Sequence, residues 1–152
     1  MSFETGFDHV DLKSVDPNFT PVPLGEYVLQ VVKGDVKEFT YKKDNPKSGT
    51  KAGDMGTYIS LSFAITDDEH FSGRRIFATL FPGEMALKNL RRLMDATGVT
   101  QGNGEPITEW IGRLPQANAM LRATVETVDE KTQDGGTAPK NAISWKTVAP
   151  AA

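Results

Sequence analysis

Cysteine is absent from this 152-residue chain, and histidine occurs only twice. Without cysteine the protein forms no disulfide, no thiolate metal site and no thiol nucleophile. His9 and His70 each stand beside acidic residues, but no second ligand set has the spacing of a metal site. Phosphate-binding glycine motifs and framed serine nucleophiles are also missing. We therefore expect a protein that is not an enzyme and that needs no cofactor.

Long apolar runs are missing as well. No stretch approaches the roughly 20 residues that a membrane-spanning helix needs, and the N-terminus lacks a signal-peptide core. The hydrophobic content of 38% and the charged content of 24% are typical of a globular domain, and the length fits one domain. We expect a protein of the cytoplasm with no membrane partner.

Charge is distributed unevenly along the chain, although the net value is only −3. Residues 1–24 carry four acids against Lys13, which leaves 16 acids and 16 bases in the remainder. Six lysines and three acids fall within Lys33–Lys51. A locally basic segment on a neutral body can bind phosphates in a salt-sensitive way.

Five segments have the composition and alternation of β-strands, and one has the 3.6-residue period of an amphipathic helix. The helix, Glu84–Thr97, has an apolar stripe of Leu87, Leu90, Leu93 and Met94, and Gly98 ends it. The predicted strands are Glu26–Phe39, Thr57–Thr66, Arg74–Phe81, Ala117–Asp129 and Asn141–Val148. Gly34 lies within the first strand and predicts a bulge or a sharp bend there.

The connecting segments are rich in turn residues. The segment 41–56 holds Asn45-Pro46 and three glycines and predicts a long loop, and Ile107–Ile111 predicts a short helical turn. Residues 1–24 contain three prolines without sustained periodicity, and we read them as an extended arm. Its phenylalanines favour packing on the domain or on a neighbouring subunit, which would make a homo-oligomer.

Three strands, one helix and two further strands are the element order of the OB-fold, a small barrel that binds oligonucleotides and oligosaccharides. We predict an all-β domain with one helix, a five-stranded OB-fold-like barrel of order β-β-β-α-β-β, over residues 25–148. The arm 1–24 precedes it and a tail, 149–152, follows. The helix should plug one end of the barrel.

Binding chemistry has better support than catalysis. Single-stranded nucleic acid is held by cations along its backbone and by aromatic rings on which bases stack. The candidate stacking residues are Phe39, Tyr41, Tyr58, Phe77 and Trp145, and the candidate phosphate contacts are Lys42, Lys43, Lys47, Lys51, Arg74 and Arg75. For each ring the alternative is a half-buried sheet residue, and for each lysine a solvated surface charge.

The segments PLGEYVLQVV, GTYISLSFAI, FSGRRIFATLF and ALKNLRRLMDATGV together resemble small phage-encoded single-stranded DNA-binding proteins. The resemblance covers about residues 23–148 and is carried by Gly25, Tyr27, Gly56, Tyr58, Leu61, Phe63, Ile65, Gly73, Arg74, Ile76, Phe77, Leu90, Leu93, Ala96 and Gly98. It implies binding of single-stranded DNA in phage replication or recombination, in the host cytoplasm, with replication or recombination proteins as partners.

One departure from that family concerns the C-terminus. Bacterial-type proteins of this function end in an acidic, aromatic-tipped tail that recruits partners, whereas this chain ends in SWKTVAPAA. We hypothesise that the acidic arm, with Phe3 and Phe7, plays that role from the other end.

Two rival functions stay open. The neutral body favours a protein-interaction module on the same fold, such as a phage assembly or host-inhibitor protein. Asp67, Asp68 and His70 suggest a metal-dependent nuclease, although a solvated acidic turn explains them more simply.

Overall fold

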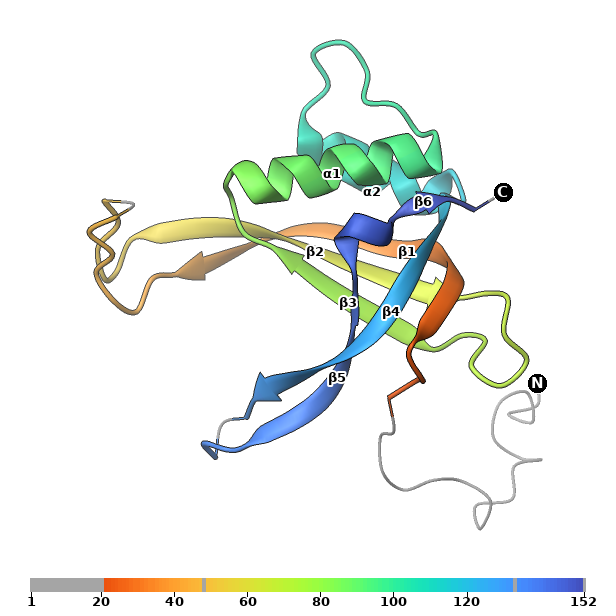
Figure 1. The fold of residues 1–152 in the computed structure, drawn as a ribbon. Coiled ribbons are helices and arrows are strands. Elements are labelled where there is room, and N and C mark those ends of the chain that lie inside the picture. Colours follow the sequence, from red (N-terminus) through yellow and green to blue (C-terminus); the bar gives the residue numbers. More distant parts are fainter. Residues whose placement is uncertain (1–20, 48, 133, 152) are drawn as a thin grey trace, which may run out of the picture.

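The computed structural model describes residues 21–47, 49–132 and 134–151, and it shows an open antiparallel sheet with two helices on one side (Figure 1). The hydrogen-bonded strand order is β3-β2-β1-β4-β5, with β6 beside β4. The elements are β1 (Gly25–Thr40), β2 (Met55–Ile65), β3 (Arg75–Leu80), α1 (Glu84–Thr97), α2 (Ile107–Gln116), β4 (Met120–Lys131), β5 (Thr137–Ile143), the short 3-10 helix η3 (Trp145–Thr147) and β6 (Ala149–Pro150).

The mostly-β character and the bounds of α1 are confirmed, and three predicted details are wrong. The predicted helical turn at Ile107 is a complete second helix, because Trp110, Ile111 and Leu114 bury one side of it. The last long strand, β5, begins earlier than predicted and ends at Ile143. The chain then turns into η3, so Trp145 does not lie on a strand. Residues 1–20 of the predicted arm lie outside the residues that the structure describes.

β3 and β5 are the two ends of the hydrogen-bonded path, and they come close to each other without pairing. The sheet therefore curls round and leaves a seam between these strands. Within the described part of the chain, no helix is long and apolar enough to cross a membrane.

The core lies between the concave side of the sheet and the two helices. Its largest fully buried side chains include Phe63 and Leu61 of β2, Leu93 of α1 and Ile111 of α2. The helix α1 ends as predicted, because Gly98 takes a left-handed conformation and donates its N–H to the carbonyl of Met94 at 3.0 Å. The predicted apolar stripe is only partly buried, since Leu87 remains 56% exposed.

A β-bulge in β1 decides which side chains reach the core. The register with β2 shifts between Val31 and Lys33. Before the shift, the odd-numbered residues Leu29 and Val31 are fully buried. After it, the odd-numbered residues Lys33, Asp35 and Lys37 lie on the other face of the sheet, where they line a shallow hollow. Because of the bulge, the odd-numbered residues of β1 are apolar core residues up to Val31 and charged residues of the opposite face from Lys33 onward.

Gly34 follows the bulge and allows α2 to lie against β1. A Cβ at this position would be 2.6 Å from Cγ2 of Ile111 and 3.0 Å from the Ile111 carbonyl oxygen. The bulge predicted at Gly34 occurs next to it, while the glycine itself is required by the close approach of the helix.

Candidate nucleic-acid interface

Three strands present a continuous face on the side of the sheet opposite the core. Cross-strand pairing aligns Lys33 with Ser62 and Phe77, and the next outward row aligns Asp35 with Ser60 and Thr79. We call this surface the outer sheet face; it comprises Lys33, Asp35, Lys37, Tyr58, Ser60, Ser62, Arg75, Phe77 and Thr79. Seven of these residues line a shallow hollow of about 290 Å³. A ligand that lies on this face would contact cations, hydroxyls and an aromatic ring together.

Phe77 is the most exposed ring on this face. Its side chain is 62% exposed although it lies in the middle of β3. Arg75 precedes it on the same side of the strand and lines the same hollow. Arg74, by contrast, is half-buried and lines neither this hollow nor the seam between β3 and β5. Of the two predicted arginines, the structure therefore brings only Arg75 to the candidate site.

Four aromatic rings gather where the outer sheet face meets the long β1–β2 hairpin. The centroid of Phe39 lies 4.7 Å from that of Tyr41, 6.0 Å from that of Tyr58 and 5.5 Å from that of Phe81. Tyr58 and Phe81 are 5.6 Å apart. We call these four residues the aromatic cluster. Its members fix one another by edge and tilted contacts, so the rings are held in place before any ligand binds.

Gly56 supports the aromatic cluster from the neighbouring strand. It pairs with Phe39 across the hairpin, and a Cβ on it would lie 2.8 Å from the Phe39 ring and 2.9 Å from the Tyr41 ring. Glycine therefore leaves the space in which these two rings pack.

Phe81 was missed by the sequence reasoning, although a signal for it exists. Counting by two along the third strand, Arg75, Phe77 and Thr79 lead to Phe81 on the same side. Its side chain is 56% exposed. The period-two pattern continues to the last residue before Pro82, and extending it would have added this ring to the candidates.

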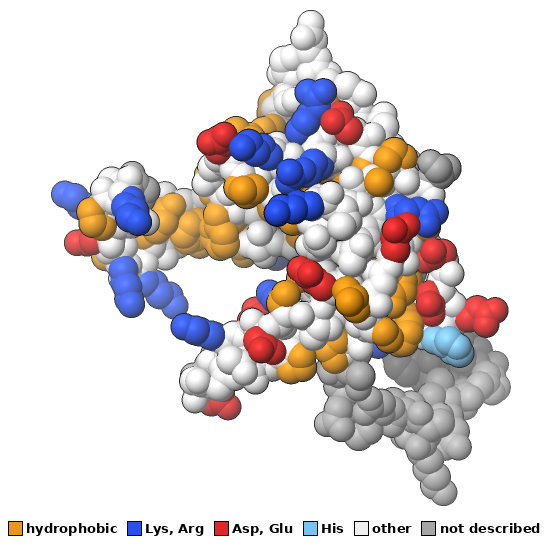
Figure 2. Space-filling model, in the orientation of Figure 1, with side chains coloured by type: hydrophobic (Ala, Val, Ile, Leu, Met, Phe, Trp, Pro, Cys, Tyr) orange, Lys and Arg blue, Asp and Glu red, His pale blue; other side chains and the backbone are white. Residues whose placement is uncertain are grey.

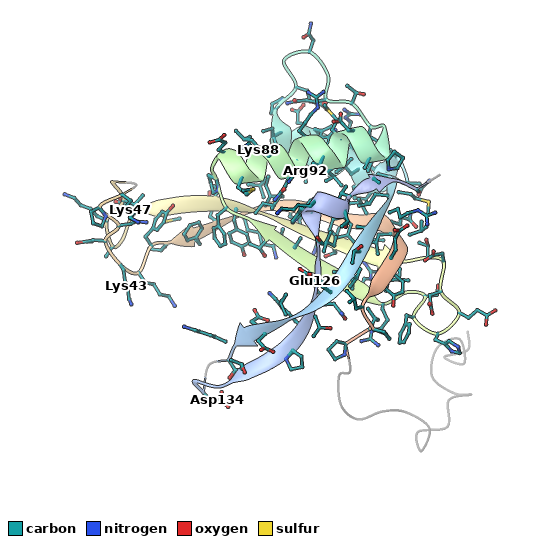
Figure 3. All side chains as sticks on the ribbon, in the orientation of Figure 1. Lys43, Lys47, Lys88, Arg92, Glu126 and Asp134 are labelled. Carbon is teal, nitrogen blue, oxygen red and sulfur yellow. The ribbon has the colours of Figure 1, made fainter. Side chains whose placement is uncertain are left out.

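The tip of the hairpin carries the four predicted loop lysines, Lys42, Lys43, Lys47 and Lys51, all exposed. Figure 3 shows Lys43 and Lys47 pointing outward from the tip, which projects beyond the body of the protein. Within residues 21–47, 49–132 and 134–151, none of the four forms a salt bridge.

The acids of the same loop are engaged with its backbone. Asp44 accepts the N–H of Ala52 at 2.8 Å, and Asp54 accepts the N–H of Lys51 at 2.8 Å. These bonds fold the loop, as side-chain acceptors often do in turns. The carboxylates thus stay on the backbone while the ammonium groups face solvent, where they are available to phosphates.

The β4–β5 hairpin has the opposite character. Lys140 is paired with Glu130 at 3.4 Å. At the tip, hydrogen bonds from the Thr132 hydroxyl and from the backbone N–H of Gly136 hold the pKa of Asp134 below its usual range. This hairpin stays anionic at its end (labelled Asp134 in Figure 3) and does not extend the basic surface.

Trp145 contributes to the seam instead of the outer sheet face. Its ring meets Phe63 edge-on at a centroid distance of 6.4 Å, so the side chain closes the core. It also lines a groove of about 620 Å³ between β3 and β5, together with Arg75 and Phe77. Part of the ring is thus accessible, but its main packing partner is the interior.

The Asp67–His70 segment is a hydrogen-bonded turn. Asp68 accepts the backbone N–H groups of His70 and Phe71 at 2.9 and 3.1 Å, and Asp67 accepts the N–H of Val28 at 3.0 Å. These carboxylates complete the backbone hydrogen bonding of the turn and of β1, which accounts for their presence without a metal.

No model of a known protein family matches this chain, and no curated protein matches it significantly. Any functional proposal therefore depends on the geometry and the charge of this surface.

Proposed function

We propose that this protein binds single-stranded DNA with little sequence preference, along the outer sheet face and the β1–β2 hairpin. The observation that carries the proposal is the placement of exposed lysines and pre-arranged aromatic rings on one continuous side of β1, β2 and β3. Cations can follow a phosphate backbone while exposed rings take stacked bases, and neither contact depends on base identity.

A single strand suits this surface better than a duplex. Phe77 and the aromatic cluster offer ring faces, and bases can stack on them only when they are unpaired. Among the described elements, no helix stands on this face to enter a major groove, because α1 and α2 cover the other side of the sheet (Figure 1).

The architecture supports an OB-fold assignment as part of this proposal. OB-folds bind ligands on the face of strands two and three, between the first and the last hairpin loops. Here β2 and β3 provide the outer sheet face, and the long loop of residues 41–54 borders it. Together with the resemblance in sequence, this supports a binding role in phage DNA replication or recombination, without catalysis and without a cofactor.

Titration of a fluorescently labelled oligothymidine at several salt concentrations tests the proposal. Binding should weaken as salt rises, with a slope of log K against log salt of about −4 for roughly six phosphate contacts on a single strand. Duplex DNA of the same length should bind more weakly, and an RNA oligonucleotide measures the sugar preference. Absent or salt-insensitive binding would overturn the proposal.

A further inference from the structure

An apolar groove lies on the helix side of the protein, and Tyr58 and Phe81 of the aromatic cluster also line it. It has a volume of about 570 Å³ and its floor is formed by Val36, Ile59 and Leu80 of the sheet and by Leu87 and Leu90 of α1. A smaller hollow of about 180 Å³ continues it between α1 and α2, past Met94 and Trp110. We call the two together the helix groove.

The helix groove has the character of a docking surface. Leu87 is 56% exposed on its wall, although a leucine at this position of an amphipathic helix would ordinarily be covered. Figure 2 shows lysine and arginine on α1 beside hydrophobic side chains, and Figure 3 labels Lys88 and Arg92 among them. The charged residues that line the groove are Glu84, which pairs with Lys88 at 3.2 Å, and Arg91, which pairs with Asp95 at 3.0 Å. The groove therefore favours an apolar segment.

The first 20 residues of this chain contain such a segment. Phe3, Phe7 and Val10 recur at intervals of four and three residues, with Glu4 and Asp8 between them. If this short part of the extended arm becomes helical on docking, these intervals place the three apolar side chains on one side of it, where they can enter the groove as anchors. The net charge of residues 1–20 is −3, from four acids and one lysine, and it is opposite in sign to the net charge of +1 on α1.

We propose that residues 3–11 of one copy dock in the helix groove of a second copy. The described chain begins at Pro21, and Val22 is held to β5 by two hydrogen bonds with Asn141, at 2.9 and 3.1 Å. This start lies on the side of the sheet opposite α1 and α2 (Figure 1). Residues 1–20 are therefore attached on the side of the sheet remote from their own groove, and the groove of a neighbouring copy can receive residues 3–11. This interface makes the protein a homo-oligomer.

Paired substitutions on α1 test the docking site in the full-length chain. Leu87→Gln removes an apolar wall of the groove, whereas Met85→Gln changes an equally exposed residue of the same helix that does not line it. By sedimentation velocity over a dilution series, Leu87→Gln and Phe7→Gln should each raise the dissociation constant of the oligomer roughly tenfold to a hundredfold, the effect of losing one buried large apolar side chain. Met85→Gln should leave it unchanged. A protein that is monomeric throughout the series, or three equal effects, would overturn the proposal.

The absence of cysteine allows a direct test of which copy donates the arm. A Thr5→Cys chain mixed with a Thr108→Cys chain places one thiol in the arm and one at the groove, since Thr108 lines it. Under mild oxidation we expect a disulfide-linked heterodimer in high yield, and a low yield when Thr127→Cys on β4 replaces Thr108→Cys. If the doubly substituted chain instead forms the bond within one molecule, or if no heterodimer forms, the second-copy proposal is wrong. Likewise, if Phe7→Gln tightens DNA binding without changing the oligomer, the arm lies on the outer sheet face and not in the helix groove.

Discussion

Replacing Phe77 with alanine separates the binding role of this ring from a structural one. The side chain is 62% exposed, so little more than a third of it is buried by the fold. Since full burial of a phenylalanine contributes about 1.5–3 kcal/mol, Phe77→Ala should lower the free energy of unfolding by only about 1 kcal/mol. Loss of one base–ring stack, in contrast, costs about 1–3 kcal/mol of binding free energy, a weakening of roughly 5- to 150-fold.

Fluorescence anisotropy with a labelled oligothymidine measures the affinity, and urea denaturation measures the stability of the same samples. Phe77→Tyr keeps a ring of similar size and should retain the affinity. Leu24→Ala is a control, because Leu24 is 72% exposed but lies outside the outer sheet face. If Phe77→Ala is folded and binds within about twofold of the parent, a difference of only about 0.4 kcal/mol, base stacking on β3 is refuted.

Three further perturbations test the hairpin, the packing of α2 and an ion pair. The double variant Lys42→Ala/Lys43→Ala should reduce the salt slope of DNA binding by about 1.4, since each lost phosphate contact on a single strand is worth about 0.7; an unchanged slope would remove the hairpin from the interface. Gly34→Ala should cost about 1–3 kcal/mol of unfolding free energy, because its methyl group would lie 2.6 Å from Ile111. The control Gly112→Ala in α2, whose methyl group meets open space, should instead stabilise by about 0.5–1 kcal/mol in the same chemical unfolding assay. Hydrogen bonds from Arg113 and from the Gly102 N–H lower the pKa of Glu105. The ionised Glu105 therefore stabilises the fold above the pKa that this carboxyl has in the unfolded chain, and this stabilisation is lost as the pH falls through the lowered folded-state pKa. Glu105→Gln should accordingly flatten the acid side of a plot of urea midpoint against pH.

The elements that the sequence predicted well are those in which one period governs the whole segment. β2 alternates without interruption from Tyr58 to Ile65, and α1 has Leu90 and Leu93 on its buried side with a glycine at its end. Local pattern and tertiary packing agree in both elements, so the sequence alone was sufficient to predict them.

The elements that were misjudged depend on contacts that the local pattern does not contain. The helix α2 continues beyond Ile111 although Gly112 and Pro115 have low helix propensity, because the burial of Leu114 outweighs it. The start of β5 at Thr137 does not follow from the sequence, because the first half of this strand is exposed and offers no apolar alternation. Trp145 was assigned to a strand since nothing in the sequence marks the turn at Ser144.

The candidate site was predicted in part for the same reason. The lysines were found from composition, and Phe77 and Tyr58 from alternation. The link between them required the cross-strand register, which places Lys33 and Lys37 beside these rings and directs Arg74 elsewhere.

The bulge in β1 makes the electrostatics of the hairpin depend on a count of residues as well as on their identity. If the present sequence of β1 paired with β2 without the bulge, every residue after Val31 would move to the opposite face of the sheet. Lys33, Asp35 and Lys37 would then face α2, and Val36 would face solvent. Deleting Val32 would instead remove the extra residue and keep the present pairing of Lys33 with Ser62. Insertions in the loop of residues 41–54 have no such effect, because no register depends on its length. Length variation among related sequences should therefore be common in that loop, whereas a residue lost from β1 should coincide with the loss of the bulge.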